Sequence, residues 1–378
     1  MAALTEEQSM LKDQAKAWVT EQAPVRAFRS MRDSGVEHCF TPAAWGAMVE
    51  MGWTGILIPE AYGGSDMGYL TLGVLLEETG RQLTASPLVA SALVGATAIL
   101  QGGNEAQQSQ WLPKIVDGSA ILTLAVDEGP KHAPERIALQ AEKSAGGFKL
   151  SGSKSFVLEG AAATVYVVAA RTSGAPGDTN GITLFLVPAD AAGISRKALK
   201  TSDSRGYANV EFSGVEVGSD AVLGQVDAGW EVLDATLDRA RAGIAGEMLG
   251  TAAEAFDMTL NYLKTRVQFG QVIGSFQALG HRAAELFSEM ELARSCVEGA
   301  LQAIDGGAKD VAQMCSLSKC RAGAFLYRMS NELIQIHGGI GMTDEYDAGF
   351  YLKRARAVEA LYGGQAFHRN RYATLLGF

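Results

Sequence analysis

The segment from Arg266 to His281 holds the residues best suited to bind a phosphorylated ligand. An arginine followed by a glycine-containing break between two helices can offer a guanidinium group and free backbone N–H groups to a phosphate. The same pattern also occurs in an ordinary turn between helices, where the arginine forms a salt bridge. The residues alone leave both interpretations open, because a short motif is only a hypothesis.

Residues 335–343 form a second glycine-rich segment, Gln-Ile-His-Gly-Gly-Ile-Gly-Met-Thr. Its three glycines permit a tight turn and a close approach of the backbone to a ligand. Taken alone, the segment is most simply the C-terminal cap of a helix. We interpret His337 as structural, since nothing nearby in the sequence indicates a metal or a catalytic partner.

The composition limits the kinds of function. The chain has 378 residues, 47% hydrophobic and 20% charged, which is typical of a globular protein with two or three domains. A net charge of −10 without a long basic run disfavours nucleic acid as a partner. The four cysteines have neither zinc-site spacing nor the density of a disulfide framework, so we expect reduced thiols, no metal and a cytoplasmic location.

We expect neither a signal peptide nor a membrane span. Residues 1–7 lack a basic region followed by an apolar core. No apolar run in the chain is long enough to cross a bilayer.

Hydrophobic periodicity divides the chain into three parts, an α+β organisation. The first part, 1–118, is predicted to be an N-terminal α-helical domain, with helix starts at Thr5 and at Thr41-Pro42 and a long helical stretch over 68–101. The second, 119–223, contains short β-prone runs and is predicted to be an antiparallel barrel or sandwich. The predicted strands lie at 122–126, 137–141, 148–150, 165–169, 182–187 and 210–217. The third part, 224–378, is predicted to be a four-helix bundle with helices over 228–264, 271–303, 309–336 and 345–362.

Both glycine-containing segments resemble motifs of the acyl-CoA dehydrogenase family, and the resemblance extends over nearly the whole chain. It implies the same helical, β, helical order of domains and an FAD cofactor. In the family signature, residues at the positions of Arg266, Phe269 and Gln277 contact the FAD of the neighbouring subunit. The second segment is similar to a Gln-x-x-Gly-Gly-x-Gly stretch that lines the adenosine half of FAD. That likeness assigns Gln335, Gly338 and Gly339 to the cofactor.

The resemblance also implies a reaction and partners. The expected reaction is α,β-dehydrogenation of an acyl-CoA thioester, in which a base removes the α-proton and a hydride leaves the β-carbon for flavin N5. The expected assembly is a dimer or tetramer, with a paralogous subunit as one form of it. The expected electron acceptor is an electron-transfer flavoprotein.

The sequence departs from the family where the flavin ring is expected. The family's barrel loop usually reads Thr-Glu-Pro followed by Gly-Ser-Asp, whereas residues 126–136 here have Asp127 at the cofactor position and no Gly-Ser-Asp. The usual Trp-x-Thr wall is replaced by Phe156 and Leu158. Phe156 can still cover the ring by stacking, but Leu158 cannot donate a hydrogen bond to N5.

A second departure removes an acid. Residues 360–364 resemble the family's Tyr-Glu-Gly segment, in which the glutamate is the catalytic base, and here Gly363 occupies the glutamate position beside Tyr362. In the family, the backbone N–H at this position polarises the thioester carbonyl, and Gly363 keeps that group. We therefore assign Tyr362 to substrate binding and expect Gly363→Glu to restore a base, provided that the pocket has room.

A substitute for the missing glutamate is available at Asp238. Some family members carry their catalytic glutamate on this helix immediately before an arginine, and Asp238 precedes Arg239. The aspartate is one methylene shorter, and reach is the first requirement of a general base. A purely structural ion pair is an equal alternative for Asp238. Arg239 is assigned to substrate binding.

Several functions remain open on the sequence alone. The chain is an active dehydrogenase with Asp238 as its base, or it is one subunit of a heteromeric enzyme whose partner supplies the glutamate. A third alternative is a non-catalytic acyl-CoA- and FAD-binding or assembly subunit on the same fold. A non-oxidative flavin lyase is a weaker fourth.

Overall fold

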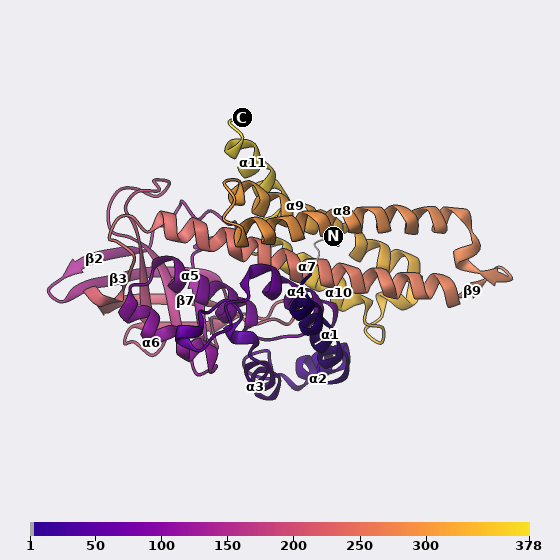
Figure 1. Ribbon diagram of the computed structural model, residues 1–378, viewed down its shortest axis with the longest axis horizontal. Coiled ribbons are helices and arrows are strands. Elements are labelled where there is room, and N and C mark those ends of the chain that lie inside the picture. Colours follow the sequence, from indigo (N-terminus) through magenta and orange to yellow (C-terminus); the bar gives the residue numbers. More distant parts are fainter. Residues whose placement is uncertain (1–3) are drawn as a thin grey trace. The chain divides into compact units, whose positions relative to one another are not determined.

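The computed structural model describes residues 4–378 (Figure 1). Residues 1–3, which the signal-peptide expectation includes, lie outside the described residues. The chain forms two compact units. The first contains the residues up to Ser30 together with Tyr69–Thr84 and Arg241–Phe378, and the second contains Met31–Gly68 and Ala85–Ala240. The domain boundaries at 118/119 and 223/224 stay predictions.

The N-terminal part is helical. Helix α1 (Glu6–Glu21) begins at the predicted capping box, in which the Thr5 side chain accepts from the Gln8 N–H and the Gln8 side chain accepts from the Thr5 N–H. Helix α3 (Pro42–Glu50) begins at Thr41, whose hydroxyl accepts from the Ala44 N–H. The other helical elements are α2 (Val25–Ser34), η1 (Trp53–Gly55), η2 (Glu60–Tyr62), α4 (Gly68–Arg81), η3 (Val89–Gly95), α5 (Ala96–Gly102) and α6 (Glu105–Val116).

The helical stretch predicted over 68–101 is present but is interrupted between Arg81 and Val89. Helix α4 ends at Arg81, and Leu83 then adopts a positive φ of 53°, which is incompatible with a right-handed helix. Pro87 follows, and proline offers no N–H to a helical hydrogen bond. The chain resumes as the π-helical turn η3 and helix α5.

The middle part forms an eight-stranded sheet within the described residues. Its strands are β1 (Leu122–Ala125), β2 (Gln140–Ser144), β3 (Gly147–Leu158), β4 (Val165–Arg171), β5 (Ile182–Pro188), β6 (Ile194–Ala198), β7 (Tyr207–Gly218) and β8 (Val222–Leu223). Along the sheet the order is β6-β7-β3-β2-β4-β5-β8, with β1 paired to β4. Most pairs are antiparallel, as predicted, but β4 runs parallel to both β1 and β2.

One face of the sheet is packed with apolar and aromatic side chains. Phe148 and Phe185 meet edge to face with ring centroids 5.1 Å apart, and Tyr166 meets Phe212 at 6.2 Å. Such buried aromatic pairs stabilise a core beyond the area they bury. The predicted middle β domain therefore has a core of its own.

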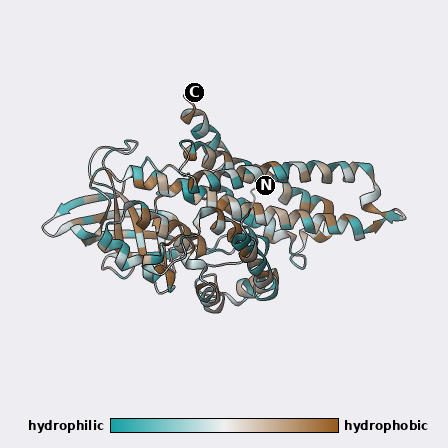
Figure 2. Ribbon diagram, in the orientation of Figure 1, coloured by the Kyte–Doolittle hydropathy of each residue, from teal (hydrophilic) through white to brown (hydrophobic). Residues whose placement is uncertain are grey.

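The C-terminal part is helical, with α7 (Trp230–Thr265), α8 (Gln277–Asp305), α9 (Val311–His337), α10 (Ala348–Ala360) and α11 (Gln365–Leu375). Helix α9 is central and packs against α8, α10 and α11. The long helices carry hydrophobic and hydrophilic residues along the same turns, as amphipathic helices do (Figure 2). The helix predicted from 271 begins only at Gln277, and α11 was not predicted.

Helices α4 and α7 approach each other through glycines. A Cβ built on Gly250 would lie within 1.8 Å of the Glu77 carbonyl oxygen, and one on Gly80 within 2.3 Å of the Glu247 carbonyl oxygen. Only glycine allows this backbone contact. Among the described residues, no helix combines the length and the apolar character needed to cross a membrane.

Candidate active site

The Arg266 segment folds as a small hairpin between α7 and α8. Strands β9 (Val267–Gln268) and β10 (Gln271–Val272) are joined by Phe269 and Gly270, with φ of 53° and 78°. Positive φ at both positions is the signature of a type I′ turn. The turn leaves the Phe269 side chain 90% exposed at the end of α7 and α8 (Figure 1).

The predicted cofactor residues of this hairpin face solvent. Arg266 and Gln277 are exposed, and within residues 4–378 the Arg266 guanidinium forms no hydrogen bond or ion pair. A side chain with several N–H donors in this state suits a phosphate, since arginine binds phosphate through two parallel hydrogen bonds. Arg266, Phe269 and Gln277 therefore fit a ligand contributed from outside this chain's own fold.

The glycine-rich segment ends α9 with a sharp turn. Gly338 has φ 62° and ψ −136°, a conformation that favours glycine, and a Cβ built on Gly338 or Gly339 would meet no atom within 4 Å. Gln335, Gly338 and Gly339 are all exposed. This turn leaves an open strip of backbone, which fits the close approach of the adenosine half of FAD.

His337, at the end of α9, contacts Tyr346 and Tyr262 of α7. Its Nδ1 donates to the Leu333 carbonyl at 2.8 Å, so in the neutral ring Nε2 accepts from the Tyr346 hydroxyl at 2.9 Å. The ring of Tyr262, near the end of α7, lies 4.2 Å from the His337 ring. Burial lowers the pKa of His337, which agrees with the structural role inferred from sequence.

In the barrel loop the Asp127 side chain is engaged by its own loop. Its carboxylate lies 2.9 Å from His132 Nδ1 and accepts from the Ala133 N–H at 3.3 Å. Its carbonyl accepts from the Ser155 N–H at 2.7 Å, which ties the loop to β3. The carboxylate already accepts hydrogen bonds within its own loop, and the assignment of Asp127 to the cofactor stays a prediction.

A buried ion pair, which the sequence did not indicate, also holds this loop. Lys154 is fully buried on β3, and its ammonium contacts Glu128 Oε1 at 2.7 Å and the Val126 carbonyl at 3.0 Å. Glu128 also accepts from the N–H groups of Ala138 and Leu139. The residue type does not distinguish a buried lysine from an exposed one. The burial of Lys154 becomes clear only from its place in the folded strand β3.

Phe156 and Leu158 end β3 differently. A bulge between Lys154 and Val157 gives Phe156 a positive φ of 53° and leaves its ring 56% exposed, with the Tyr207 ring 6.0 Å away edge to face. An exposed ring can stack on a flavin. Leu158 is buried, and its carbonyl accepts from the Thr123 hydroxyl.

Gly363, which stands where the family has its catalytic glutamate, lies in a turn whose backbone conformation favours glycine. Gly363 has φ +104°, and a Cβ built there would lie 2.5 Å from Cδ1 of Phe367 and 3.0 Å from Nε2 of His368. The Gly363 N–H lies 3.2 Å from the Ala360 carbonyl, to which it donates, so a thioester carbonyl would share that hydrogen. Tyr362, the predicted substrate residue, is buried with φ 56°.

Asp238, the candidate for a substitute base, lies on α7 in the second unit. Asp238 is 4% exposed, and the Arg239 guanidinium donates to the Ala235 carbonyl one turn earlier at 3.0 Å. A carboxylate that is this buried is stable only when it is paired, hydrogen-bonded or protonated. Asp238 and Gly363 belong to different compact units.

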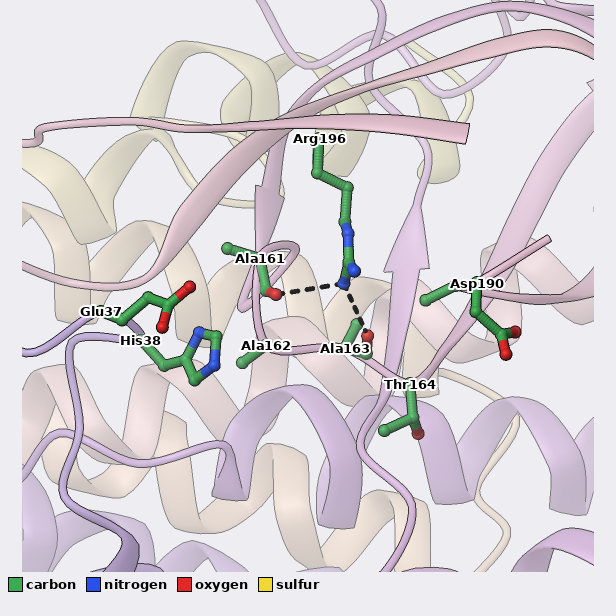
Figure 3. Close-up of a pocket in the computed structure, with 9 residues that line it drawn as sticks. Glu37, His38, Ala161, Ala162, Ala163, Thr164, Asp190 and Arg196 are labelled. Atoms are coloured by element: carbon green, nitrogen blue, oxygen red, sulfur yellow. Dashed lines mark hydrogen bonds between the residues drawn. The ribbon is translucent and has the colours of Figure 1, made fainter. Parts of the chain in front are cut away.

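A hollow of about 530 Å³ in the second unit is lined by none of the predicted site residues, and Figure 3 shows the side chains around it. Glu37, His38 and Asp190 line it, and Arg196 enters it while donating to the Ala161 and Ala163 carbonyls at 3.2 and 3.3 Å. Because both acidic and basic side chains line the hollow, its charge does not indicate one class of ligand. Residues 4–378 contain no group of three or more His, Cys, Asp or Glu able to hold a metal ion.

Comparison with known proteins agrees with this architecture. Residues 5–119 match the acyl-CoA dehydrogenase N-terminal domain, 133–217 the middle domain and 227–376 the C-terminal domain. The chain is 30% identical over 370 residues to mitochondrial isovaleryl-CoA dehydrogenase of Pongo abelii, with 94% of this chain and 85% of that protein covered.

Two solved structures share the fold over nearly all of the chain. A G363A variant of the Tcur3481-Tcur3483 steroid ACAD is 31% identical with a TM-score of 0.88, and 98% of each chain is covered. The ChsE4-ChsE5 complex of Mycobacterium tuberculosis is 25% identical with a TM-score of 0.90, and covers 100% of this chain and 99% of that chain. The chain therefore belongs to the acyl-CoA dehydrogenase family, FAD-dependent oxidoreductases that act on acyl-CoA.

Proposed function

We propose that this chain is one subunit of a heteromeric acyl-CoA dehydrogenase. It would contribute residues that hold FAD, while a paralogous partner would contribute the glutamate that removes the α-proton. The observation that supports this most is the backbone at Gly363. A φ of +104° and the Phe367 ring at 2.5 Å from a built Cβ mean that the base position is formed around a glycine rather than merely lacking a side chain.

The proposed FAD contacts are shared between subunits. The Arg266 guanidinium would bind phosphate, Phe269 and Gln277 would reach the neighbour's cofactor, and the open backbone at Gly338 and Gly339 would accept the adenosine half beside Gln335. Bound FAD would take the hydride from the β-carbon. A phenylalanine ring that is 90% exposed at a hairpin tip favours this arrangement, since a large exposed apolar group is commonly covered in an assembly.

On the β side, Phe156 would cover the flavin ring by stacking. Leu158 would act only as apolar wall, and Asp127 only through the loop that it holds together. Tyr362 and Arg239 would contact the acyl-CoA, and the Gly363 N–H would polarise the thioester carbonyl. An electron-transfer flavoprotein would reoxidise the complex, and four free cysteines agree with a cytoplasmic location.

A chain active alone with Asp238 as base is the second candidate. Its support is the position of Asp238 directly before Arg239, and its difficulty is the burial of the carboxylate. A non-catalytic assembly role would leave the exposed Arg266 and the open glycine turn without an evident use.

The assembly can be tested by producing this chain with and without a paralogue that has glutamate at the position of Gly363. Native mass spectrometry and the flavin absorbance then give the subunit composition and the FAD content per chain. We expect a mixed dimer or tetramer that retains FAD. A stable homo-oligomer of this chain that does not bind the paralogue and retains one FAD per chain would contradict the proposal.

A further inference from the structure

The turn that carries Gly363 is strained. Leu361 has φ −63° and ψ 123°, Tyr362 has φ 56°, and the Gly363 N–H donates to the Ala360 carbonyl at 3.2 Å. These are the features of a type II β-turn, whose third residue needs a positive φ and is usually glycine or asparagine. A tyrosine there persists only when its surroundings hold it in place.

Two buried cations hold this turn by its carbonyl oxygens. The Lys319 ammonium, fully buried on α9, donates to the Gly363 carbonyl at 3.2 Å and to the carbonyls of Val358 and Glu359 at 3.2 and 3.0 Å. Arg241 on α7 is also fully buried, and its Nε donates to the Tyr362 carbonyl at 3.3 Å.

Burial disfavours the charged form of Lys319 and lowers its pKa to about 7, and two neighbouring features partly offset this cost. The Val358 and Glu359 carbonyls lie in the last turn of α10, where a helix carries partial negative charge and a cation is stabilising. The Arg241 guanidinium also lies 5.3 Å from the centre of the Phe367 ring, a cation–π distance. The same Phe367 ring occupies the space that a Cβ at Gly363 would need.

The two contacts fix the direction of the Gly363 N–H. A peptide bond is planar and trans, so the N–H of one residue points opposite to the carbonyl of the residue before it. Arg241 therefore sets the Gly363 N–H by holding the Tyr362 carbonyl, and Lys319 sets the following peptide plane by holding the Gly363 carbonyl.

We propose that Lys319 and Arg241 are positioning residues of the acyl-CoA site, which hold the strained Tyr362–Gly363 turn and thereby aim the Gly363 N–H. The holding of the turn follows from contacts within one compact unit. Its effect on acyl-CoA rests on the proposed function, in which that N–H faces the thioester carbonyl.

The test uses the chain in the assembly in which it purifies, with three variants. Lys319→Met removes the donors but keeps the length of the side chain, and Lys319→Arg keeps charge and donors. Lys309→Met is the matched control, since Lys309 is exposed. Hydrogen exchange of the peptide that spans residues 360–364 is followed by mass spectrometry near pH 6, below the pKa of about 7 to which burial lowers Lys319, so that the ammonium is protonated.

We expect exchange in this peptide to quicken about tenfold or more in Lys319→Met, because a hydrogen bond to a charged group is lost. Exchange should be largely restored in Lys319→Arg and unchanged in Lys309→Met. Exchange in Lys319→Met at the wild-type rate would overturn the proposal. If Lys319→Met does not accumulate as folded protein, Lys319→Gln, which removes the charge and whose amide nitrogen ends one bond short of the lysine Nζ, takes its place with the same outcomes.

A second readout separates positioning from general stability. The dissociation constant of an acyl-CoA thioester, followed by the flavin spectrum, should rise about tenfold in Lys319→Met with the FAD content unchanged, and Lys319→Arg should recover it. If Lys319→Met loses FAD as well as affinity for the acyl-CoA thioester, and Lys319→Arg restores neither, Lys319 has only a general structural role. That result would contradict the proposal. If hydrogen exchange of residues 360–364 is faster in Lys319→Met but the flavin spectrum responds to no thioester, the result supports the role of Lys319 in holding the turn. The same result would count against the proposed function.

Discussion

The Phe367 ring occupies the space where the side chain of residue 363 would begin. A Cβ on Gly363 would lie 2.5 Å from Phe367 Cδ1, closer than real Cβ contacts occur, and 3.1 Å from its Cε1. Phe367 lies one turn into α11, and the chain reaches it through Gly364, the N-cap of that helix. The glycine at position 363 and the placement of α11 are therefore linked, because the Phe367 ring of α11 fills the space of a side chain at 363.

Gly363→Glu is consequently expected to destabilise the chain. Because Phe367 leaves no room for the new side chain, we no longer expect this substitution to restore a base. Overpacking against Phe367 costs about 1–3 kcal/mol, and the positive φ adds about 1 kcal/mol. Thermal unfolding should show a lower midpoint, and flavin bleaching by thioesters should not appear. Gly349→Glu is the control, since a Cβ at Gly349 meets no atom within 4 Å.

Truncation of the blocking ring tests the same explanation. The double variant Gly363→Glu/Phe367→Ala should recover part of the stability lost in Gly363→Glu, because the collision is removed. Equal unfolding midpoints for Gly363→Glu and wild type would contradict the steric account.

Asp238→Asn distinguishes the two candidate bases. If a partner supplies the glutamate, the rate of flavin bleaching in the complex should change little. If Asp238 is the base, the rate should fall by about 10²–10⁴-fold with FAD still bound. Stopped-flow absorbance gives the rate, and Asp234→Asn, one turn earlier on α7, controls for loss of a carboxylate on this helix.

Arg266→Ala should weaken FAD retention by about 10- to 100-fold, because a charge-assisted phosphate contact is lost. Arg266→Lys should recover only part of it, since an ammonium cannot replace a bidentate guanidinium. Equilibrium dialysis with flavin fluorescence measures the retention. Lys264→Ala, an exposed charge loss two residues away, should retain FAD as wild type does.

His337 gives the stability of the helical unit an acid-side pH dependence. Its pKa in the folded chain is lowered by burial, whereas an unfolded histidine titrates near about 6.5. Below that pH the unfolded state binds more protons, so the free energy of unfolding falls as the pH falls from about 6.5 toward the folded pKa. Urea unfolding across this range should show a shallower slope in His337→Gln, while the exposed His281→Gln should keep the wild-type slope.

Local sequence signals predicted much of the fold. Thr5 with Gln8 and Thr41 with Pro42 start helices because their hydroxyls accept from nearby N–H groups, a relationship confined to one turn of the chain. Strand β6 was missed because Ile194–Ala198 is mostly polar and exposed, so it lacks the alternation that marks a strand. Leu83 ended a predicted helix through its backbone conformation, which its residue type does not indicate.

The candidate site was less accessible to sequence reasoning. The resemblance identified Arg266 and the glycine turn, whose character depends on a few adjacent residues. It could not show that His132 engages Asp127, that Lys154 lies buried against Glu128, or that Lys319 on α9 reaches the Gly363 carbonyl 44 positions away. These contacts depend on how distant segments pack, and packing leaves no local pattern.

In the proposed heteromeric enzyme, this chain holds a flavin site and supplies no base of its own. The most direct measurement is anaerobic flavin bleaching by a panel of acyl-CoA thioesters, including a short branched and a steroid acyl group, for this chain alone and for its mixture with a glutamate-bearing paralogue. We predict that the flavin of the isolated chain does not bleach and that the mixed complex bleaches rapidly. Bleaching of the isolated wild-type chain at the rate of the complex would contradict the account.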